Sequence, residues 1–407
     1  MKCRHCKTPL CHVFIDLGYA PPSNAYLSED ELHRPETYYP LKLFVCDQCW
    51  LVQTQDFVAA DAIFTSDYAY FSSTSSSWLQ HAADYSSMIM KRLDLGGNSL
   101  VIEIAANDGY LLRNFVQKGI PCLGIEPTAS TAAVAETQGI PMLREFFGNV
   151  LGQRLVANGK QADLIIGNNV FAHVPDINDF TAGLKTALKP KGVITLEFPH
   201  LLKLIEQNQF DTVYHEHFSY LSLHAVQRIL NAQHLRLWDV EQLPTHGGSL
   251  RVYGIHTEDQ RHTTRAVTDL LATEQRQGLL GLDTYQAFQR RADRVKNDLV
   301  AHLISQRSAG KRIAAYGAAA KGNTLLNYAG VKRDLLPFVC DAAPAKQGKY
   351  LPGSRIPIHS PTFLREARPD EVLILPWNIA DEVQAQLADL AEQGVRFTTA
   401  VPELKTQ

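Results

Sequence analysis

The sequence lacks the long apolar segment that a membrane-spanning protein needs. No stretch approaches the roughly 18 consecutive apolar residues of a membrane helix, and the apolar run at 100–106 is interrupted by Glu103. The N-terminal residues MKCRHCK are polar and have no apolar signal-peptide core. The sequence therefore predicts a soluble, cytoplasmic protein without a membrane partner.

An excess of basic residues is also missing. Lys and Arg total 39 and Asp and Glu total 42, which gives a net charge of −3. Nucleic-acid-binding proteins usually carry a basic excess or a basic stripe, and neither is visible. We therefore expect no nucleic-acid partner, although a balanced total still allows a local anion site.

The composition is that of a globular protein. The chain has 407 residues, of which 45% are apolar and 20% are charged, so collagen-like and wholly disordered proteins are excluded. At about 150 residues per domain, this length predicts two or three domains.

Cysteine is scarce except near the N-terminus. Cys3/Cys6 and Cys46/Cys49 form two C-x-x-C pairs, whose thiolates can complete a tetrahedral Zn²⁺ shell. The odd total of seven argues against a disulfide framework. A redox dithiol or two unrelated pairs are the alternatives, since the 39 intervening residues exceed the commonest zinc-ribbon spacing. We predict a structural Zn²⁺ that stabilises a small module, with no open coordination position. The other cysteines are Cys11, Cys122 and Cys340.

From residue 99 the sequence alternates strand and helix patterns. The predicted strands are 100–104, 122–126, 163–166 and 192–196, and the predicted helices between them are 110–118, 128–137 and 177–188. Such repeated units predict a parallel, doubly wound sheet of the α/β class. A pair of strands is expected at 235–240 and 249–255, followed by long helices over 258–308 and a second Rossmann-like unit from residue 312.

Polar residues follow the first two predicted strands, where doubly wound sheets bind their ligands. Glu103 and Asn107-Asp108-Gly109 end the first strand, and Glu126 ends the second. An acid at the second position can accept both hydroxyls of a ribose. The turn has one glycine instead of G-x-G-x-x-G, which favours S-adenosylmethionine (SAM) over NAD because SAM has no pyrophosphate. Solvated strand ends without a ligand are the alternative.

The segment VIEIAANDGY (101–110) resembles motif I of class I SAM-dependent methyltransferases. Together with the four-cysteine module, it resembles the nucleotide-sugar C-methyltransferases of deoxysugar pathways, over essentially the whole chain. The other matching segments are YAYFSS (68–73), NNVFAH (168–173), YHEHFSY (214–220) and 341–358. The resemblance implies a zinc-binding module over 1–65, a SAM-dependent methyltransferase domain over 66–255 and a nucleotide-sugar-binding α/β domain over 256–407.

The run Tyr214-His215-Glu216-His217 suggests acid–base chemistry. The zinc-protease pattern H-E-x-x-H would need a histidine where the sequence has Ser219. A histidine near its ordinary pKa of about 6.5 can accept a proton at neutral pH. A purely structural polar cluster is the alternative.

The resemblance implies methylation at C3 of a 4-keto deoxysugar carried on a nucleoside diphosphate. The keto group acidifies the C3 proton, and the enolate formed by its removal attacks the methyl group of SAM, without any need for a metal. We expect His217 to be the base, with Tyr214 and Glu216 orienting it. We expect Tyr68 to donate to the 4-keto oxygen, and His173 to contact the sugar or assist proton transfer.

Further residues are candidates for the cofactor site. Phe146 and Phe147 are expected either to cover the adenine or to lie in the core. Asn168 and Asn169 follow the predicted strand at 163–166 and are expected to bind the amino-acid part of SAM or the substrate.

The C-terminal unit begins with a turn of small residues at Tyr316-Gly317. Its Lys321-Gly322 order differs from the Gly-Lys-[Ser/Thr] of a Walker P-loop. We expect Tyr316, Lys321 and Lys346 to bind the nucleotide and its diphosphate, with NAD as the rival ligand.

Two other functions stay open from the sequence. A SAM-dependent O- or N-methyltransferase would not need a base beside a ketone, and a non-catalytic protein would bind zinc and nucleotides only. The nucleobase, the C3 substituent, the product configuration and the oligomeric state, a monomer included, are not specified.

Overall fold

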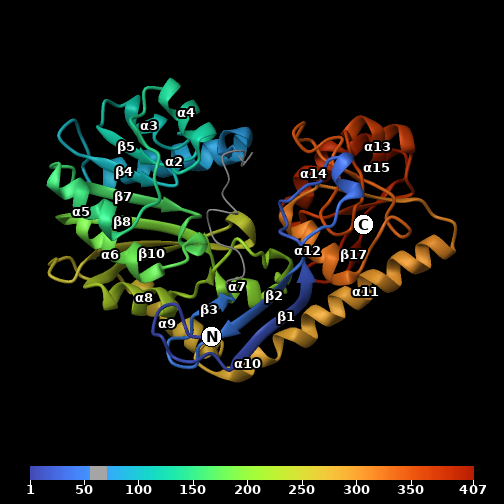
Figure 1. The fold of residues 1–407 in the computed structure, drawn as a ribbon, viewed down its shortest axis with the longest axis horizontal. Coiled ribbons are helices and arrows are strands. Elements are labelled where there is room, and N and C mark those ends of the chain that lie inside the picture. Colours follow the sequence, from blue (N-terminus) through green and yellow to red (C-terminus); the bar gives the residue numbers. More distant parts are fainter. Residues whose placement is uncertain (56–70) are drawn as a thin grey trace.

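The computed structural model describes residues 1–55 and 71–407 and contains three β-sheets. In Figure 1 two large α/β units stand side by side, and the N-terminal strands and the long helix α11 (Phe288–Ser308) lie along the lower edge. No helix among the described residues is both long enough and apolar enough to cross a membrane.

The N-terminal sheet is antiparallel and recruits a strand from the middle of the chain. Its order is β1 (His12–Ala20), β2 (Tyr39–Val45), β3 (Val52–Thr54) and β9 (Ser219–Tyr220). Alternation along β2 buries Leu41, Leu43 and Val45. These side chains share one hydrophobic cluster with α10 (Leu282–Gln286), α11 and the C-terminal unit. The N-terminal strands therefore bury their apolar side chains against other parts of the chain.

The methyltransferase sheet has seven strands in the order β10-β11-β8-β7-β4-β5-β6. The five central and edge strands β4 to β8 are parallel, and β11 runs antiparallel to both β8 and β10. The predicted doubly wound sheet with its terminal strand pair is thus confirmed. The strands are β4 (Val101–Ile104), β5 (Cys122–Ile125), β6 (Met142–Leu143), β7 (Ala162–Asn168), β8 (Leu188–Pro199), β10 (Leu235–Leu243) and β11 (Ser249–His256).

Helices cover both faces of this sheet (Figure 1). The helix predicted over 110–118 is shorter than expected, because the turn after β4 continues to Leu112 before α3 begins. The helices are α2 (Ser76–Arg92), α3 (Arg113–Val116), α4 (Ala129–Thr137), α5 (Asn149–Ala157), α6 (Ile177–Ala187), α7 (Leu201–Glu206) and α8 (Leu223–Ala232).

The C-terminal unit is a second α/β sheet, in the order β14-β13-β12-β15-β16-β17. All neighbouring pairs are parallel except β16 and β17, and α9 (Arg265–Arg276), α10 and α11 connect the sheet to the methyltransferase unit. Its elements are β12 (Ile313–Tyr316), α12 (Ala320–Ala329), β13 (Val339–Cys340), β14 (Ile358–His359), α13 (Pro361–Ala367), β15 (Glu371–Ile374), α14 (Ala380–Gln386), α15 (Ala388–Glu392), β16 (Arg396–Thr399) and β17 (Lys405–Thr406).

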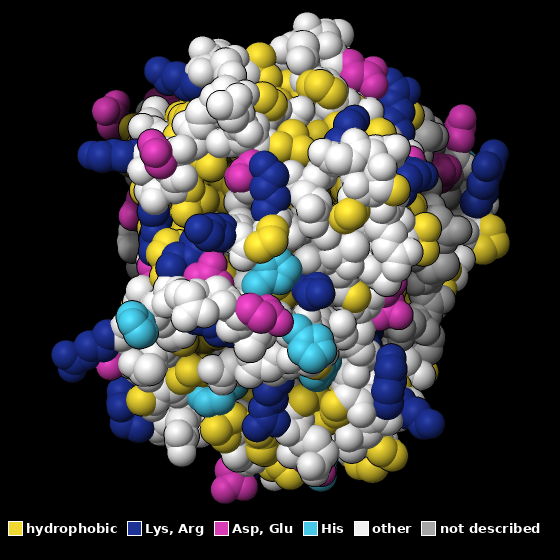
Figure 2. Space-filling model, turned by 90° about the vertical axis from the view of Figure 1, so that its left-hand side faces the viewer, with side chains coloured by type: hydrophobic (Ala, Val, Ile, Leu, Met, Phe, Trp, Pro, Cys, Tyr) yellow, Lys and Arg dark blue, Asp and Glu magenta, His cyan; other side chains and the backbone are white. Residues whose placement is uncertain are grey.

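Charged side chains of both signs are mixed on the face of the molecule that Figure 2 draws. On the face drawn in Figure 2, Lys and Arg alternate with Asp and Glu, and histidines gather near the centre. This mixing agrees with the net charge of −3.

Candidate functional site

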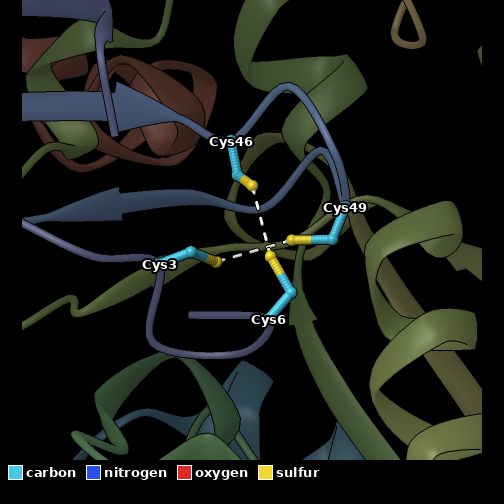
Figure 3. Close-up of side chains that lie close together, drawn as sticks. All are labelled: Cys3, Cys6, Cys46 and Cys49. Carbon is cyan, nitrogen blue, oxygen red and sulfur yellow. Dashed lines mark hydrogen bonds between the residues drawn. The ribbon is translucent and has the colours of Figure 1, made fainter. Parts of the chain in front are cut away.

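Four cysteine side chains converge beside the N-terminal sheet (Figure 3). Their Sγ atoms all lie within 4.8 Å of one another, with Cys3–Cys49 at 3.5 Å and Cys6–Cys46 at 3.4 Å. A tetrahedral Zn²⁺ with Zn–S bonds of about 2.3 Å needs S–S separations of about 3.8 Å, which this cluster matches closely. The hydrogen bond with the Cys49 thiol lowers the pKa of Cys3, which favours the thiolate form of this cysteine.

Each C-x-x-C pair lies in a turn of its own, and the two turns have the same backbone geometry. The N–H groups of Lys7 and Trp50 donate to the carbonyls of Cys3 and Cys46, at 3.0 and 2.9 Å. Lys7 and Trp50 both have positive φ, at 64° and 62°. Much of the 39-residue gap between the pairs is occupied by the adjacent strands β1 and β2, which bring the pairs back together. Cys11 is exposed and lies outside the cluster.

The loop after β4 has the backbone of a ligand-binding turn. Ala105, Asn107 and Gly109 have positive φ values of 58°, 49° and 77°. A Cβ on Gly109 would lie only 2.4 Å from Ile140 Cδ1, so a larger residue would collide there. The Asn107 side-chain oxygen accepts a hydrogen bond from the N–H of Ser72 at 2.9 Å. This hydrogen bond joins the backbone at Ser72 to the loop after β4.

The two acids expected to serve the cofactor lie on neighbouring strands. Glu126 accepts hydrogen bonds from the backbone N–H of Asn107 at 3.0 Å and of Thr128 at 2.8 Å. Burial, together with the charges of Glu126 and Asp108, raises the pKa of Glu103 well above its usual range. The structure brings these acids together at the carboxyl ends of β4 and β5, where the fold binds nucleosides.

Several buried polar atoms in this region have no partner among the described residues. They are Oε2 of Glu103, Oδ1 of Asp108, both amide atoms of Asn168 and Oδ1 of Asn169. Buried polar groups are normally hydrogen-bonded, so unpaired ones at strand ends suit a ligand. This donor and acceptor set fits the amino and carboxylate groups and the ribose of SAM.

The two phenylalanines differ in environment. Phe146 is 55% exposed, whereas Phe147 packs edge-on against Phe180 with ring centroids 5.4 Å apart. Phe147 is therefore a packing residue, and only Phe146 stays a prediction for a contact with the adenine.

The ring of His217 lies within a cluster of aromatic side chains. Its centroid is 4.6 Å from that of His173 and 4.7 Å from that of Tyr214. Burial holds the pKa of His217 well below its ordinary value, and His173 and His246 add to this effect. The imidazole is consequently neutral at pH 7, which is the form that can accept a proton.

The neighbouring histidines have different surroundings. His215 turns toward the N-terminal sheet, where its Nε2 lies 3.3 Å from the carbonyl oxygen of Tyr39. His173 places Nδ1 at 2.9 Å from the carbonyl oxygen of Glu216, and a carbonyl only accepts, so this nitrogen carries the proton. Burial lowers the pKa of His173 to about 4.

The carboxylate of Glu216 is held by the N-terminal module. Asn24 Nδ2 donates to both of its oxygens, at 3.0 and 3.1 Å. The nearby Tyr26 hydroxyl donates to the carbonyl of Ala318 in the C-terminal unit at 2.6 Å. Neither Asn24 nor Tyr26 was predicted as a site residue, because nothing in their local sequence indicates a contact so far along the chain. Tyr68, the predicted donor to the 4-keto oxygen, lies outside the described residues.

The three residues predicted to bind the nucleotide, Tyr316, Lys321 and Lys346, make contacts with different partners. Lys321 Nζ donates to Asn378 at 2.5 Å and lies 4.7 Å from the Trp377 ring centroid. Lys346 donates to the carbonyl of Ala318 at 2.9 Å and pairs with Asp341 at 3.5 Å. The Tyr316 hydroxyl lies 3.4 Å from the side-chain oxygen of Gln386, and its ring packs in the hydrophobic cluster around α13 and α14.

A further histidine, His246, lies near this site and was not predicted as a site residue. Its φ is 55°, and its Nε2 lies 3.4 Å from Asn169 Nδ2. Trp78 on α2 lies beside it, at a centroid distance of 5.3 Å. The His-Gly-Gly sequence was the available signal, because such a turn tolerates positive φ.

Comparisons with known proteins match all three units. Residues 3–64 match a family model described as "Putative zinc binding domain", residues 78–240 a "Methyltransferase domain" and residues 244–402 a "C-methyltransferase C-terminal domain". The chain is 34% identical to the C-methyltransferase NovU of Streptomyces niveus, over 99% of this chain and 96% of that protein. The chain belongs to the zinc-containing, SAM-dependent C-methyltransferases. SAM is its cofactor and Zn²⁺ its structural metal, and carbon methylation is favoured over O- or N-methylation and over a non-catalytic role.

The solved structures described next each cover about half of this chain. Magnesium protoporphyrin IX methyltransferase of Synechocystis, with bound SAM, is 14% identical over 44% of this chain and 79% of its own, with a TM-score of 0.34. The 1,6-didemethyltoxoflavin N1-methyltransferase of Burkholderia thailandensis is 15% identical over 51% of this chain and 95% of its own, with a TM-score of 0.38.

Replacing one zinc ligand should remove the metal and destabilise the protein. We expect Cys6→Ser to lower the bound zinc, measured by atomic emission. It should also lower the thermal unfolding midpoint, because the other three thiolates lose the metal that joins them. Cys11→Ser, at an exposed cysteine outside the cluster, is the matched control and should keep both values. Unchanged zinc content in Cys6→Ser would contradict the assignment.

Neutralising Glu126, the acid predicted to bind the ribose, should weaken cofactor binding. Hydrogen bonds to charged groups contribute about 1.5–3 kcal/mol, so Glu126→Gln should raise the Kd for SAM by roughly 10- to 150-fold. Isothermal titration measures this value directly. Glu136→Gln is the control, because Glu136 pairs with Arg144 on the surface, and equal SAM affinity in both variants would overturn the role of Glu126.

Proposed function

We propose that the enzyme methylates C3 of a 4-keto deoxysugar carried on a nucleoside diphosphate. The observation that carries this proposal is the neutral His217 imidazole, enclosed by Tyr214 and His173. Carbon next to a ketone becomes nucleophilic only after it loses a proton, so a C-methyltransferase acting there needs such a base.

The reaction begins with proton removal from C3. The C3–H electron pair moves toward the C4 carbonyl oxygen, the proton goes to an imidazole nitrogen of His217, and an enolate results. The ring of His217 lies beside those of Tyr214 and His173. A neutral imidazole keeps a free electron pair on one ring nitrogen, and this nitrogen can accept the C3 proton.

Methyl transfer completes the reaction. SAM supplies an electrophilic methyl group bound to a sulfonium sulfur. The enolate carbon forms a bond to this methyl group, the C–S bond breaks with its electrons moving to sulfur, and the C4 ketone is restored. Tyr68 stays the predicted donor that stabilises charge on the 4-keto oxygen, and His173 the predicted sugar contact.

The C-terminal unit is the proposed site for the nucleotide of the substrate. Lys321 stands at the first turn of α12, and Lys346 lies against the turn that precedes this helix. A helix N-terminus with lysines nearby favours a diphosphate. Tyr316 lies at the end of β12, the edge where such sheets bind ligands.

Removing the base should slow both chemical steps. We expect His217→Asn to reduce hydrogen–deuterium exchange at C3 in D₂O, and methyl transfer, by about 10²- to 10⁴-fold. A panel of thymidine-, uridine-, cytidine- and guanosine-diphosphate 4-keto deoxysugars, followed by mass spectrometry, measures both. His215→Asn is the matched control from the same segment and should keep the exchange. Full exchange in His217→Asn, or no methylation of any substrate by the unaltered enzyme, would refute the proposal.

The rate should be insensitive to mild acid. Because burial holds the pKa of His217 below 6.5, the competent neutral form is already complete above that pH. We expect kcat/KM to show no loss from His217 protonation between about pH 8 and pH 6.5, and to fall only at lower pH. A pH–rate profile measures this, and an acid limb centred at or above pH 6.5 would show that the base is a different group or that its pKa is unshifted.

A further inference from the structure

Trp377 belongs to the C-terminal unit but contacts the methyltransferase unit. Its Nε1 donates to Oδ2 of Asp211 at 2.7 Å. The turn at Gly247 closes over the same ring, since a Cβ there would lie 2.5 Å from Cη2 of Trp377. The indole is thus fixed from two sides by the methyltransferase unit.

Asp211 is a buried carboxylate that the proposed chemistry does not use. It is 0% exposed, and its Oδ1 has no partner among the described residues. Burial raises its pKa to about 6, against the opposing effects of Lys321 and the Trp377 hydrogen bond. Burying a charge is costly unless it is paired, so this carboxylate calls for a role that an apolar side chain would not fill.

The position of Asp211 connects it to the base. Asp211 lies in the short 3-10 helix Phe210–Thr212, which leads through Val213 to Tyr214. The ring of Tyr214 lies 4.7 Å from that of His217, and its carbonyl accepts a hydrogen bond from the backbone N–H of His217 at 3.2 Å. The C-terminal unit also contacts the other side of Thr212, because the Thr324 hydroxyl donates to the carbonyl of Val213 at 2.9 Å. The backbone that orients the base is therefore held at both flanks by side chains of another unit.

We propose that Trp377 and Asp211 are positioning residues for the methyl-transfer reaction, through which the C-terminal unit sets the orientation of the base. The proposal rests on the proposed function of His217. Trp377 fixes Asp211, Asp211 fixes the Phe210–Thr212 turn, and this turn places Tyr214, whose ring packs against the imidazole. Neither residue touches the reacting atoms.

The first test needs no substrate. The full-length zinc protein is labelled with [¹³Cε1]histidine, and the His217 ring signal is assigned by its loss in His217→Asn. Trp377→Phe keeps a ring but removes the Nε1–H group, and we expect it to shift the His217 signal. The signals of His256 and His359 should stay in place. Trp238→Phe is the matched control, because Trp238 packs on Tyr253 within a different hydrophobic cluster.

The second test separates rate from binding. Misplacing a catalytic group by about 1 Å can cost about 100-fold, so we expect Trp377→Phe to lower kcat by roughly 10- to 100-fold while the Kd for SAM stays unchanged. Asp211→Asn keeps an acceptor for Trp377 and should have a smaller effect of the same kind. In the double variant the second change should add little, since both remove one connection.

The outcomes are distinct for the two proposals. An unmoved His217 signal in Trp377→Phe and Asp211→Asn, or an equal shift in Trp238→Phe, overturns the positioning role. Should Trp377→Phe fail to fold by thermal unfolding, Asp211→Asn decides. If the unaltered enzyme methylates none of the nucleotide sugars, the proposed substrate is wrong, and the histidine signal still tests the positioning role.

Discussion

The segment from Asp211 to Tyr220 is held in place by contacts with all three units, and the geometry of the site depends on these contacts. Strand β9 at its end pairs with β3 of the zinc-bearing sheet. The carboxylate of Glu216 receives Asn24 from the N-terminal module, and Val213 receives Thr324 from the C-terminal unit. The candidate base therefore sits on backbone that no single unit could fix alone.

The zinc centre is connected to this segment through Arg4 and strand β3. The backbone N–H of Arg4, beside Cys3, donates to the side chain of Gln53 in β3, and the Arg4 guanidinium donates to the carbonyl of Pro175 at 2.7 Å. Strand β3 is the neighbour of β9. A metal with a complete set of thiolates has no open position for chemistry, so its contribution is to order the sheet edge that β9 joins.

Local patterns in the sequence were enough to predict much of the fold. The C-x-x-C spacing indicated the metal, and the alternation of apolar runs with polar strand ends indicated the sheet and placed Glu103 and Glu126 together. These predictions succeed because the determining contacts are short in sequence or follow from strand order. The predicted helix over 110–118 was too long, because left-handed turn residues delay its start.

Other features depend on contacts that no local pattern encodes. Asn24 and Glu216 are 192 residues apart, and Asp211 and Trp377 are 166 apart. Composition says nothing of such pairs, since each partner is an ordinary polar or aromatic residue in its own segment. The opposite orientations of His215 and His217 likewise follow from packing against Tyr39 on one side and His173 on the other.

The insertion of β9 into the N-terminal sheet limits how this enzyme can be taken apart or recombined. A cut after the zinc-bearing strands would leave β3 with an unpaired edge, because its neighbour travels with the methyltransferase segment. Exchanging the C-terminal unit for that of another enzyme would also exchange the side chains that flank Thr212. Chimaeras that carry the C-terminal unit of another enzyme would therefore need matched partners at Asp211 and Val213. The three units depend on one another and are not separable modules.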